Sequence, residues 1–193
     1  MNLPKFSVII PAYNSEAFIT RALDSVAQQT FTDYELIIVC DSCKDKTADV
    51  ARCYTDKVYE VDYHRDGLTR NYGIDRANGD WLLFMDDDDW WLHEYVLAQL
   101  ADMTGHHCED ILRFSFIWKG IGYAKCGDYF ACWNKVWKRS FVGDTRFSDI
   151  ENWSDVDFHN AMMAKNPIVF DWNMPMYYYN YLRPGSISQI NGG

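Results

Sequence analysis

The feature that most restricts the fold of this chain is a regular alternation of short apolar runs with amphipathic segments through its first half. Four runs have the length and apolar content of buried strands: 6–13, 34–40, 57–63 and 81–85. Three segments between them space their apolar residues as a helix does: 18–26, 46–54 and 68–77. Because parallel neighbours need a long crossover connection, this order predicts an α/β fold with a mainly parallel sheet and helices on both faces.

The order of elements changes beyond residue 104. We expect strands at 110–118 and 176–182, a glycine-containing loop or hairpin at 119–130, and helices at 133–141 and 154–165. No repeat or low-complexity linker divides the chain. Its 193 residues, of which 48% are hydrophobic, are therefore expected to form one domain over 1–193, with a loose tail at the C-terminal glycines.

Targeting signals and cysteine chemistry bear on the cellular compartment. The N-terminus lacks the apolar stretch and cleavage site of a signal peptide, and no apolar run approaches the ~20 residues that cross a bilayer. A cytoplasmic protein with six reduced cysteines is the resulting expectation. Cys40 and Cys43 spell CxxC, but no second close pair completes a zinc site.

Charge is unevenly distributed along the sequence. The formal net charge is −10, yet acidic residues predominate through residue 112 and basic residues predominate over 113–146. The acidic part is suited to holding a metal ion, and the basic stretch to an anionic partner. A merely solvated surface explains the same asymmetry. The overall acidity weakens a nucleic-acid-binding role.

Four consecutive carboxylates, Asp86 to Asp89, follow the apolar run 81–85 directly. Two unit charges ~4 Å apart repel by roughly 4 kcal/mol at the effective dielectric of a protein surface, so a cation is expected nearby. Strand alternation places Asp86 and Asp88 on one side, which suits Mn²⁺ or Mg²⁺ with oxygen ligands. Such an ion would neutralise a departing diphosphate. The alternative is that Asp88 or Asp89 only caps a helix beginning near 91.

Neither common glycine-rich phosphate loop is present. GxxxxGK[ST] is absent, and the first predicted strand is followed by PAYNSE instead of GxGxxG. A nucleotide would therefore be bound by a different scheme.

Six segments resemble, in order and spacing, the family 2 glycosyltransferases of the GT-A fold. They are VIIPAYNSEAFI (8–19), ELIIVCDSCKDKT (35–47), LTRNYGIDRANGDWLLFMDDDDWW (68–91), CWNKVWKRS (132–140), WSDVDFHNAMM (153–163) and YYYNYLRPGSIS (177–188). The resemblance implies a Rossmann-like GT-A domain with a mainly parallel central sheet. It further implies a nucleotide-sugar-binding half over 1–104 and a smaller acceptor-binding half over 105–193.

The same resemblance assigns the donor side of the site. It implies nucleotide-sugar-binding roles for Pro11, Ala12, Tyr13, Glu16, Asp41, Arg70, Asn71, Asp86, Asp87 and Asp88. Asp41 would read the uracil edge, and Asp86 and Asp88 match the DxD pair that holds the ribose and the Mn²⁺ or Mg²⁺ ion. Near the C-terminus, Arg183, Ser186 and Ser188 match the segment that closes on the diphosphate. A histidine common there is Arg183 in this chain.

For the general base, the resemblance points to Asp155, which takes the aspartate of an EDxxF pattern ending at Phe158. The preceding glutamate of that pattern is Ser154 here. Ser154 and Asp157 also fit a helix-capping box, in which case the carboxylates would serve only the helix dipole. Asp157 and Glu151 are the reserve candidates for the base.

The acceptor side is matched by Trp133, Asn134 and Lys135 of the WNK segment, although a tryptophan here also fits a core. These matches together predict an inverting, metal-dependent enzyme that transfers a hexose from a UDP-sugar, with UDP-glucose as the first guess. The alternatives are a non-catalytic sugar-nucleotide binder and a magnesium phosphohydrolase. A processive synthase is disfavoured because QxxRW is absent. The acceptor is left open among a glycan, a lipid carrier, a protein and a nucleic acid.

Overall fold

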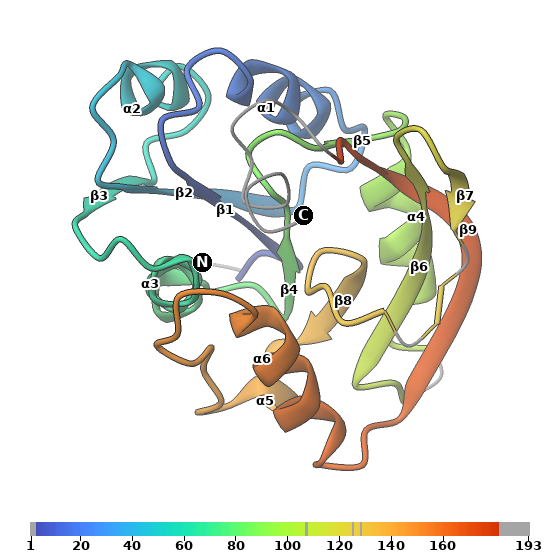
Figure 1. The fold of residues 1–193 in the computed structure, drawn as a ribbon. Helices are drawn as coiled ribbons and strands as arrows, with labels where there is room; N and C mark the ends of the chain where they lie inside the picture. The colour runs from blue at the N-terminus through green and yellow to red at the C-terminus, as the bar shows by residue number, and fades with distance from the viewer. Residues whose placement is uncertain (1–2, 107, 125, 128, 182–193) are drawn as a thin grey trace.

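The first half of the chain forms the parallel part of a central sheet (Figure 1). The computed structural model describes residues 3–106, 108–124, 126–127 and 129–181. Its first four strands lie in the order β3-β2-β1-β4, all parallel: β1 (Phe6–Ala12), β2 (Tyr34–Asp41), β3 (Val58–Val61) and β4 (Trp81–Phe84). The crossovers are helical: α1 (Ile19–Ala27), α2 (Thr47–Ala51) and α3 (Asp66–Arg76). The predicted alternation of strands and helices is confirmed.

The second half continues the same sheet with mixed strand directions. Its strands are β5 (Trp90–Trp91), β6 (Ile111–Trp118), β7 (Gly122–Ala124), β8 (Lys135–Lys138) and β9 (Val169–Tyr179). Its helices are α4 (Val96–Met103), α5 (Arg139–Val142) and α6 (Ser154–Met163). Strand β8 runs antiparallel to both β4 and β6, and β6 runs parallel to β9. The sheet is therefore continuous from one half of the chain to the other.

The helix predicted over 133–141 is wrong. The segment forms strand β8 followed by the short helix α5. Its apolar residues Trp133, Val136 and Trp137 are spaced as on a helix, so periodicity alone misleads here. The unpaired backbone edges of β4 and β6 decide the outcome, because a strand between them satisfies both ladders.

Two further boundaries differ from the predictions. The helix expected near 91 begins at Val96, because Trp90–Trp91 instead pairs with β9. The strand expected at 176–182 begins earlier, at Val169, and ends at Tyr179. It pairs with β6 along its length, with a register irregularity near Ser115. The predicted hairpin at 119–130 is represented by the pairing of β6 with β7.

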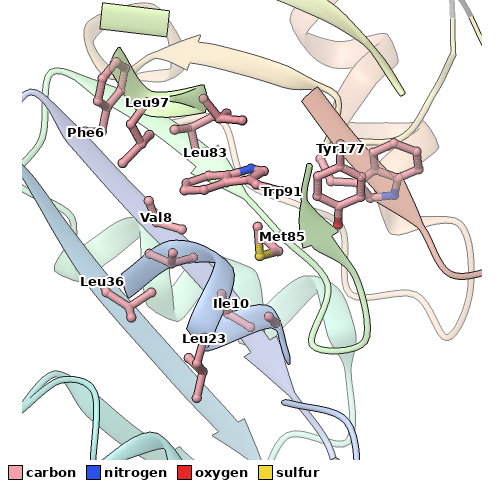
Figure 2. Packing of buried hydrophobic residues seen from close by; sticks show 14 of the residues in the cluster. Phe6, Val8, Ile10, Leu23, Leu36, Leu83, Met85, Trp91, Leu97 and Tyr177 are labelled. Carbon is pink, nitrogen blue, oxygen red and sulfur yellow. The ribbon is translucent and has the colours of Figure 1, made fainter. Parts of the chain in front are cut away.

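Each strand of the parallel part sends alternate side chains into two apolar layers. One layer contains Phe6, Val8 and Ile10 of β1 with residues of α1 and α4. Figure 2 shows this cluster, in which Leu23, Leu83, Met85 and Trp91 converge on the same space. The opposite layer contains Ile9, Leu82 and Phe84 with Ile74 of α3 and Phe158 and Met162 of α6. The helices that carry the site residues are thus anchored on the second face.

Close approach of α3 to the sheet depends on a glycine. A Cβ at Gly73 would overlap the Cγ2 atom of Ile9 in β1. Within the residues that the structure describes, no helix is both long enough and apolar enough to cross a membrane.

Candidate functional site

The candidate site lies beyond the carboxyl ends of β1, β2 and β4, which are adjacent in the sheet. Parallel register brings these three ends to one edge, where open α/β sheets bind their ligands. The loops that follow are joined directly. The Tyr13 N–H donates to Asp87 Oδ2 at 3.1 Å, and Cys43 Sγ donates to the Ala12 carbonyl at 3.4 Å.

The four aspartates alternate in burial. Asp87 and Asp89 are buried, whereas Asp86 and Asp88 are partly exposed. The predicted sharing of one side by Asp86 and Asp88 therefore agrees with their exposure. The expected cation is Arg70 of α3, which is 5% exposed and donates from Nη2 to Asp86 Oδ1 at 2.7 Å. Its other terminal nitrogen pairs with Asp66, which lies one helical turn earlier.

Asp89 serves β9. It is fully buried, and its carboxylate accepts hydrogen bonds from the Tyr177 hydroxyl at 2.7 Å and the Asn180 N–H at 2.7 Å. Burial and the neighbouring Asp86 and Asp88 raise the pKa of Asp89 well above its ordinary value. The capping alternative for Asp88 or Asp89 is wrong, because α4 begins at Val96 and has no side-chain cap.

Three consecutive residues of α3 connect the separate parts of the site. Thr69 Oγ1 donates to Asp41 Oδ2 at 2.9 Å, and Arg70 pairs with Asp86. Asn71 exchanges two hydrogen bonds with the backbone of Phe147, at 2.8 and 2.9 Å. The segment 147–153 then leads into α6, which carries Asp155. Helix α3 therefore fixes the end of β2, the end of β4 and the approach to α6 relative to one another.

The Asp41 carboxylate is buried and already fully engaged. It accepts the N–H groups of Tyr63, His64 and Arg65 at 2.8 to 3.0 Å, in addition to the hydroxyls of Thr69 and Ser42. Burial alone would raise its pKa, but these hydrogen bonds outweigh burial and lower the pKa below its usual value. In this structure Asp41 holds the loop between β3 and α3, so contact with a uracil edge requires it to exchange one of these partners.

The remaining donor-side residues lie in two loops that are hydrogen-bonded to each other. The Glu16 N–H donates to Asp45 at 3.0 Å, and Glu16 Oε2 accepts from the Lys46 N–H at 3.1 Å. Pro11 and Ala12 are buried at the end of β1, whereas the Tyr13 side chain is 55% exposed. Tyr13 therefore presents the free aromatic surface in this group.

Asp155 stands at the start of α6, partly exposed, with its Oδ1 accepting the Val156 N–H at 3.0 Å. Burial raises its pKa; Arg70 lowers it and Asp86 raises it, with a net increase. These contributions also place Asp155 within electrostatic range of the Arg70 and Asp86 pair.

The alternative of a capping box at α6 is wrong. The helix is capped by Trp153, which has no side-chain capping bond, and Ser154 is already the first helical residue. Asp157, a reserve candidate for the base, is exposed and accepts from Ser148 Oγ at 2.9 Å. Glu151, the other reserve, is also exposed. Asp155 is therefore the least exposed of the three carboxylates.

The WNK segment is placed in the interior, which revises its expected contact with an acceptor. Trp133, Asn134 and Lys135 are all buried. The Trp133 indole stacks on the Tyr177 ring at 4.7 Å, and the Lys135 ammonium donates to the Tyr129 carbonyl at 2.5 Å and the Ala131 carbonyl at 2.7 Å. These contacts are those of a core segment. Arg183, Ser186 and Ser188 lie outside the described residues.

Sequence reasoning missed several residues around Asp86 and Asp155. Tyr177 donates to Asp89 and accepts the Asp86 N–H at 3.1 Å, although it lies far along the chain. Burial, with Asp155 and Asp86 nearby, raises the pKa of Tyr129 to about 12. Burial raises the pKa of the Cys132 thiol to about 12, in the neighbourhood of Arg70. The tyrosine-rich run at 176–182 was the one signal in the sequence for these residues. It predicted a strand but did not show that Tyr177 would contact Asp86 and Asp89.

The donor set fits a divalent ion that arrives with a diphosphate. Among the residues described, no three histidine, cysteine or acidic side chains gather closely enough to form a metal cage. Asp86 and Asp88 are instead the two partly exposed aspartates of the run that follows β4. Mg²⁺ commonly takes one or two protein carboxylates and fills its remaining positions with phosphate oxygens and water.

A family model described as Glycosyl transferase family 2 matches residues 7–169 of this sequence. The chain belongs to glycosyl transferase family 2. Two curated relatives of this family 2 glycosyltransferase come from Mycobacterium bovis and Staphylococcus aureus. The PGL/p-HBAD biosynthesis glycosyltransferase of Mycobacterium bovis (strain BCG / Pasteur 1173P2) is 39% identical over 113 residues, which cover 55% of this chain and 44% of the relative.

The second relative is the poly(ribitol-phosphate) beta-N-acetylglucosaminyltransferase TarS of Staphylococcus aureus (strain Mu50 / ATCC 700699). It is 35% identical over 125 residues, which cover 61% of this chain and 21% of TarS. The matches thus span less than half the length of either relative.

Two solved glycosyltransferase structures are similar to this chain in fold. The crystal structure of S. aureus TarS 1–349 in complex with UDP-GlcNAc gives a TM-score of 0.83 at 24% identity, over 96% of this chain and 60% of that chain. Glucosyl-3-phosphoglycerate synthase from Mycobacterium tuberculosis, in complex with Mg²⁺ and UDP, gives 0.71 at 16% identity, over 94% and 73%. The predicted GT-A fold is confirmed by these similarities.

Proposed function

We propose that this family 2 glycosyltransferase transfers a hexose from a UDP-sugar to an acceptor hydroxyl by a single inverting displacement, with Mg²⁺ or Mn²⁺ bound at Asp86 and Asp88. The observation that carries the proposal is that Thr69, Arg70 and Asn71 join the end of β2, the end of β4 and the segment that leads into α6. The complexes of TarS with UDP-GlcNAc and of the mycobacterial synthase with UDP support the choice of a uridine nucleotide.

On the donor side, the proposal assigns each residue a role that its surroundings allow. Tyr13 offers an exposed ring for stacking on the uracil. Three further residues shape the loop around the nucleoside: Pro11, Ala12 and Glu16. Asp86 and Asp88 would hold the ion, which neutralises charge on the diphosphate when bound. Arg70 keeps Asp86 oriented, and Asp87 fixes the loop through Tyr13. Five further residues would position the nucleoside loop and the carboxylates that hold the ion: Asp41, Asn71, Trp133, Asn134 and Lys135.

On the acceptor side, Asp155 would be the general base. The acceptor hydroxyl transfers its proton to the Asp155 carboxylate while its oxygen forms a bond to the anomeric carbon of the sugar. The bond from that carbon to the diphosphate oxygen breaks, and UDP leaves with the electron pair. A base needs a pKa not far below the working pH, and the increased pKa of Asp155 moves it in that direction.

A non-catalytic binder of sugar nucleotides is the second candidate. It is favoured by Ser154, a small buried hydroxyl residue at the position where the resembling enzymes carry a glutamate. Such a protein would bind UDP at the same edge of the sheet and have no turnover.

One experiment separates the two. Purified protein is assayed with Mg²⁺ for release of the nucleoside diphosphate from UDP-glucose, UDP-GlcNAc and GDP- and dTDP-sugars, with and without a pool of candidate acceptors. We expect release from a UDP-hexose, reduced at least ~100-fold in Asp155→Asn while UDP affinity measured by calorimetry is retained. Asp157→Asn, two residues further along the same helix, is the matched control and keeps its turnover. UDP binding without release from any donor would favour the binder.

A magnesium phosphohydrolase would behave differently in the same preparation. It would release phosphate from simple phosphomonoesters, and added UDP would have no effect. We expect no such release.

A further inference from the structure

Trp153 stands out among the residues that the proposed donor site does not use. Its side chain is 70% exposed, the highest value among the exposed large apolar residues of the described chain. Its backbone is left-handed, with φ 69° and ψ 21°. Burial of a tryptophan is favourable and a left-handed conformation is unfavourable for a bulky residue, so both features work against stability. Backbone strain of this kind is concentrated at functional sites.

Trp153 also lies close in the chain to the candidate base. It caps α6 and precedes Asp155 by two residues. One helical turn beyond Asp155 on the same face, His159 contacts the ring of Phe130 at 5.3 Å, and Phe130 is 48% exposed. Tyr129 lies within electrostatic range of Asp155 as well. The surroundings of the candidate base are therefore aromatic.

The charge of this segment limits the chemistry of the ligand. From 148 to 158 the chain contains four carboxylates, Asp149, Glu151, Asp155 and Asp157, and no lysine or arginine. The two arginines near these carboxylates are already paired, Arg65 with Asp149 at 3.5 Å and Arg70 with Asp66 and Asp86. An acceptor that brings a phosphate to this surface would therefore meet a net negative charge and be repelled. A neutral pyranose ring is not repelled, and its apolar C–H face matches the face of an indole.

We propose that Trp153 is an acceptor-binding residue, whose indole stacks on the apolar face of a neutral pyranose and directs one hydroxyl of that sugar toward Asp155. The acceptor class is then a carbohydrate that ends in a hexopyranoside. This inference rests on the proposed function, since it takes Asp155 as the base.

Saturation-transfer NMR tests the contact without requiring turnover. The probes are methyl β-D-glucopyranoside, methyl N-acetyl-β-D-glucosaminide and glycerol 3-phosphate, each added to the full chain with UDP and Mg²⁺. We expect at least one pyranoside to give enhancements concentrated on the C–H protons of one ring face. The signal should fall at least five-fold in Trp153→Ala and be partly kept in Trp153→Phe. Tyr95→Ala, which removes an exposed aromatic residue elsewhere, is the matched control and leaves the signal unchanged.

Three results would overturn the inference: equal pyranoside signals in wild type and Trp153→Ala, no pyranoside signal in wild type, or a stronger signal from glycerol 3-phosphate. The NMR experiment also does not require Asp155 to act as the general base. A pyranoside signal that depends on Trp153 and persists in Asp155→Asn supports the surface even if no UDP-sugar is turned over. In that case the proposed function fails and the binding surface stands.

A purely structural role for Trp153 is tested separately. Trp153→Gly removes the side chain and relieves the left-handed backbone together. We expect its melting temperature to equal or exceed that of wild type, with the pyranoside signal lost. A lower melting temperature, together with an unchanged signal, would assign Trp153 to the fold instead.

Discussion

At the scale of single residues, Arg70 is the group on which the acidic edge depends. Its guanidinium is almost completely buried, pairs with Asp66 and Asp86, and lies near Asp155. Four adjacent aspartates are tolerable because each of the two buried ones has donors from the protein and Asp86 has this cation. Arginine suits the position because it stays charged when buried and can serve two carboxylates at once.

Replacement of Arg70 by methionine should therefore destabilise the fold. The substitution keeps the apolar stem but leaves the carboxylates of Asp66 and Asp86, with exposed fractions of 40% and 27%, without their shared cation. Allowing for this exposure, we expect a loss of about 2–4 kcal/mol in the free energy of unfolding, measured by urea denaturation. Arg76→Met on the same helix removes an exposed arginine beside Tyr72 and should cost less than about 1 kcal/mol. Equal losses in the two variants would contradict this account of Arg70.

The increased pKa of Asp155 leads to a prediction about pH. If Asp155 is the base, kcat/KM rises with pH on an acid limb whose midpoint lies above the ordinary aspartate value of about 3.9, and the limb disappears in Asp155→Asn.

The same increase in pKa makes a prediction about thermal stability. A carboxyl whose folded pKa exceeds its unfolded pKa contributes stability below the unfolded pKa, and this contribution is lost as pH rises through the folded pKa. Asp155→Asn should therefore melt above wild type at pH 7, and this difference should shrink as pH is lowered toward 4. A variant that melts lower at pH 7 would argue against a desolvated carboxylate.

At the scale of residues, the sequence predicted the kind of group that lies beside the aspartates better than it predicted which residues form hydrogen bonds with one another. A cation beside the aspartates followed from Coulomb repulsion. The exposure of Asp86 to Asp89 alternates as predicted, although β4 ends at Phe84 and the aspartates lie in the turn beyond it. The saturation of Asp41 by the 63–65 backbone could not be predicted, because it depends on how a loop closes. The role of Tyr177 depends on β9 returning beside the aspartates from the far end of the chain.

At the scale of elements, the site depends on how closely α3 approaches the segment that leads into α6. A Cβ at Gly67 would lie 2.7 Å from the Ser148 carbonyl oxygen, 3.0 Å from the Ser154 Cβ and 3.1 Å from the Phe147 Cβ. Only a residue without a side chain permits this contact. Gly67 and the Asn71 bonds to Phe147 together fix where α6, and hence Asp155, begins.

Gly67→Ala should therefore impair catalysis more than donor binding. The added methyl pushes the 147–154 segment away from α3, and a displacement of Asp155 by a few tenths of an ångström weakens proton transfer. We expect kcat to fall about ten-fold or more while the Kd for UDP, measured by calorimetry, changes less than about three-fold. Gly127→Ala, at a position with nothing within 4 Å, is the control and should leave both unchanged. A larger effect on UDP affinity than on kcat would show that α3 mainly serves the nucleotide.

Elements in the parallel half were predictable because β1, β2 and β4 are buried on both faces, and helix α1 has one apolar side. The segment 133–141 was not, because Trp133, Val136 and Trp137 satisfy a helical period while all three are buried in or beside a strand. Only the pairing needs of β4 and β6 distinguish the two outcomes, and these needs are not local in sequence.

At the scale of the whole molecule, one sheet carries both halves of the site. Strand β8 joins the parallel part to the mixed part, and β9 returns so that Tyr177 and Asn180 hold the aspartates from the far side. The edge at the carboxyl ends of β1, β2 and β4 and the start of α6 are therefore parts of a single packed body. A ligand that binds this edge and not the unfolded chain should stabilise the entire fold by mass action.

The central claim is that the acidic end of β4 binds a nucleotide diphosphate through a divalent ion. The most direct test is calorimetric titration of UDP into the protein with Mg²⁺ and with EDTA, for wild type and for Asp88→Asn. The account predicts that UDP affinity in wild type falls at least ten-fold when the metal is removed, and that Asp88→Asn binds equally weakly in both conditions. Wild-type affinity that is the same with Mg²⁺ and with EDTA would contradict it.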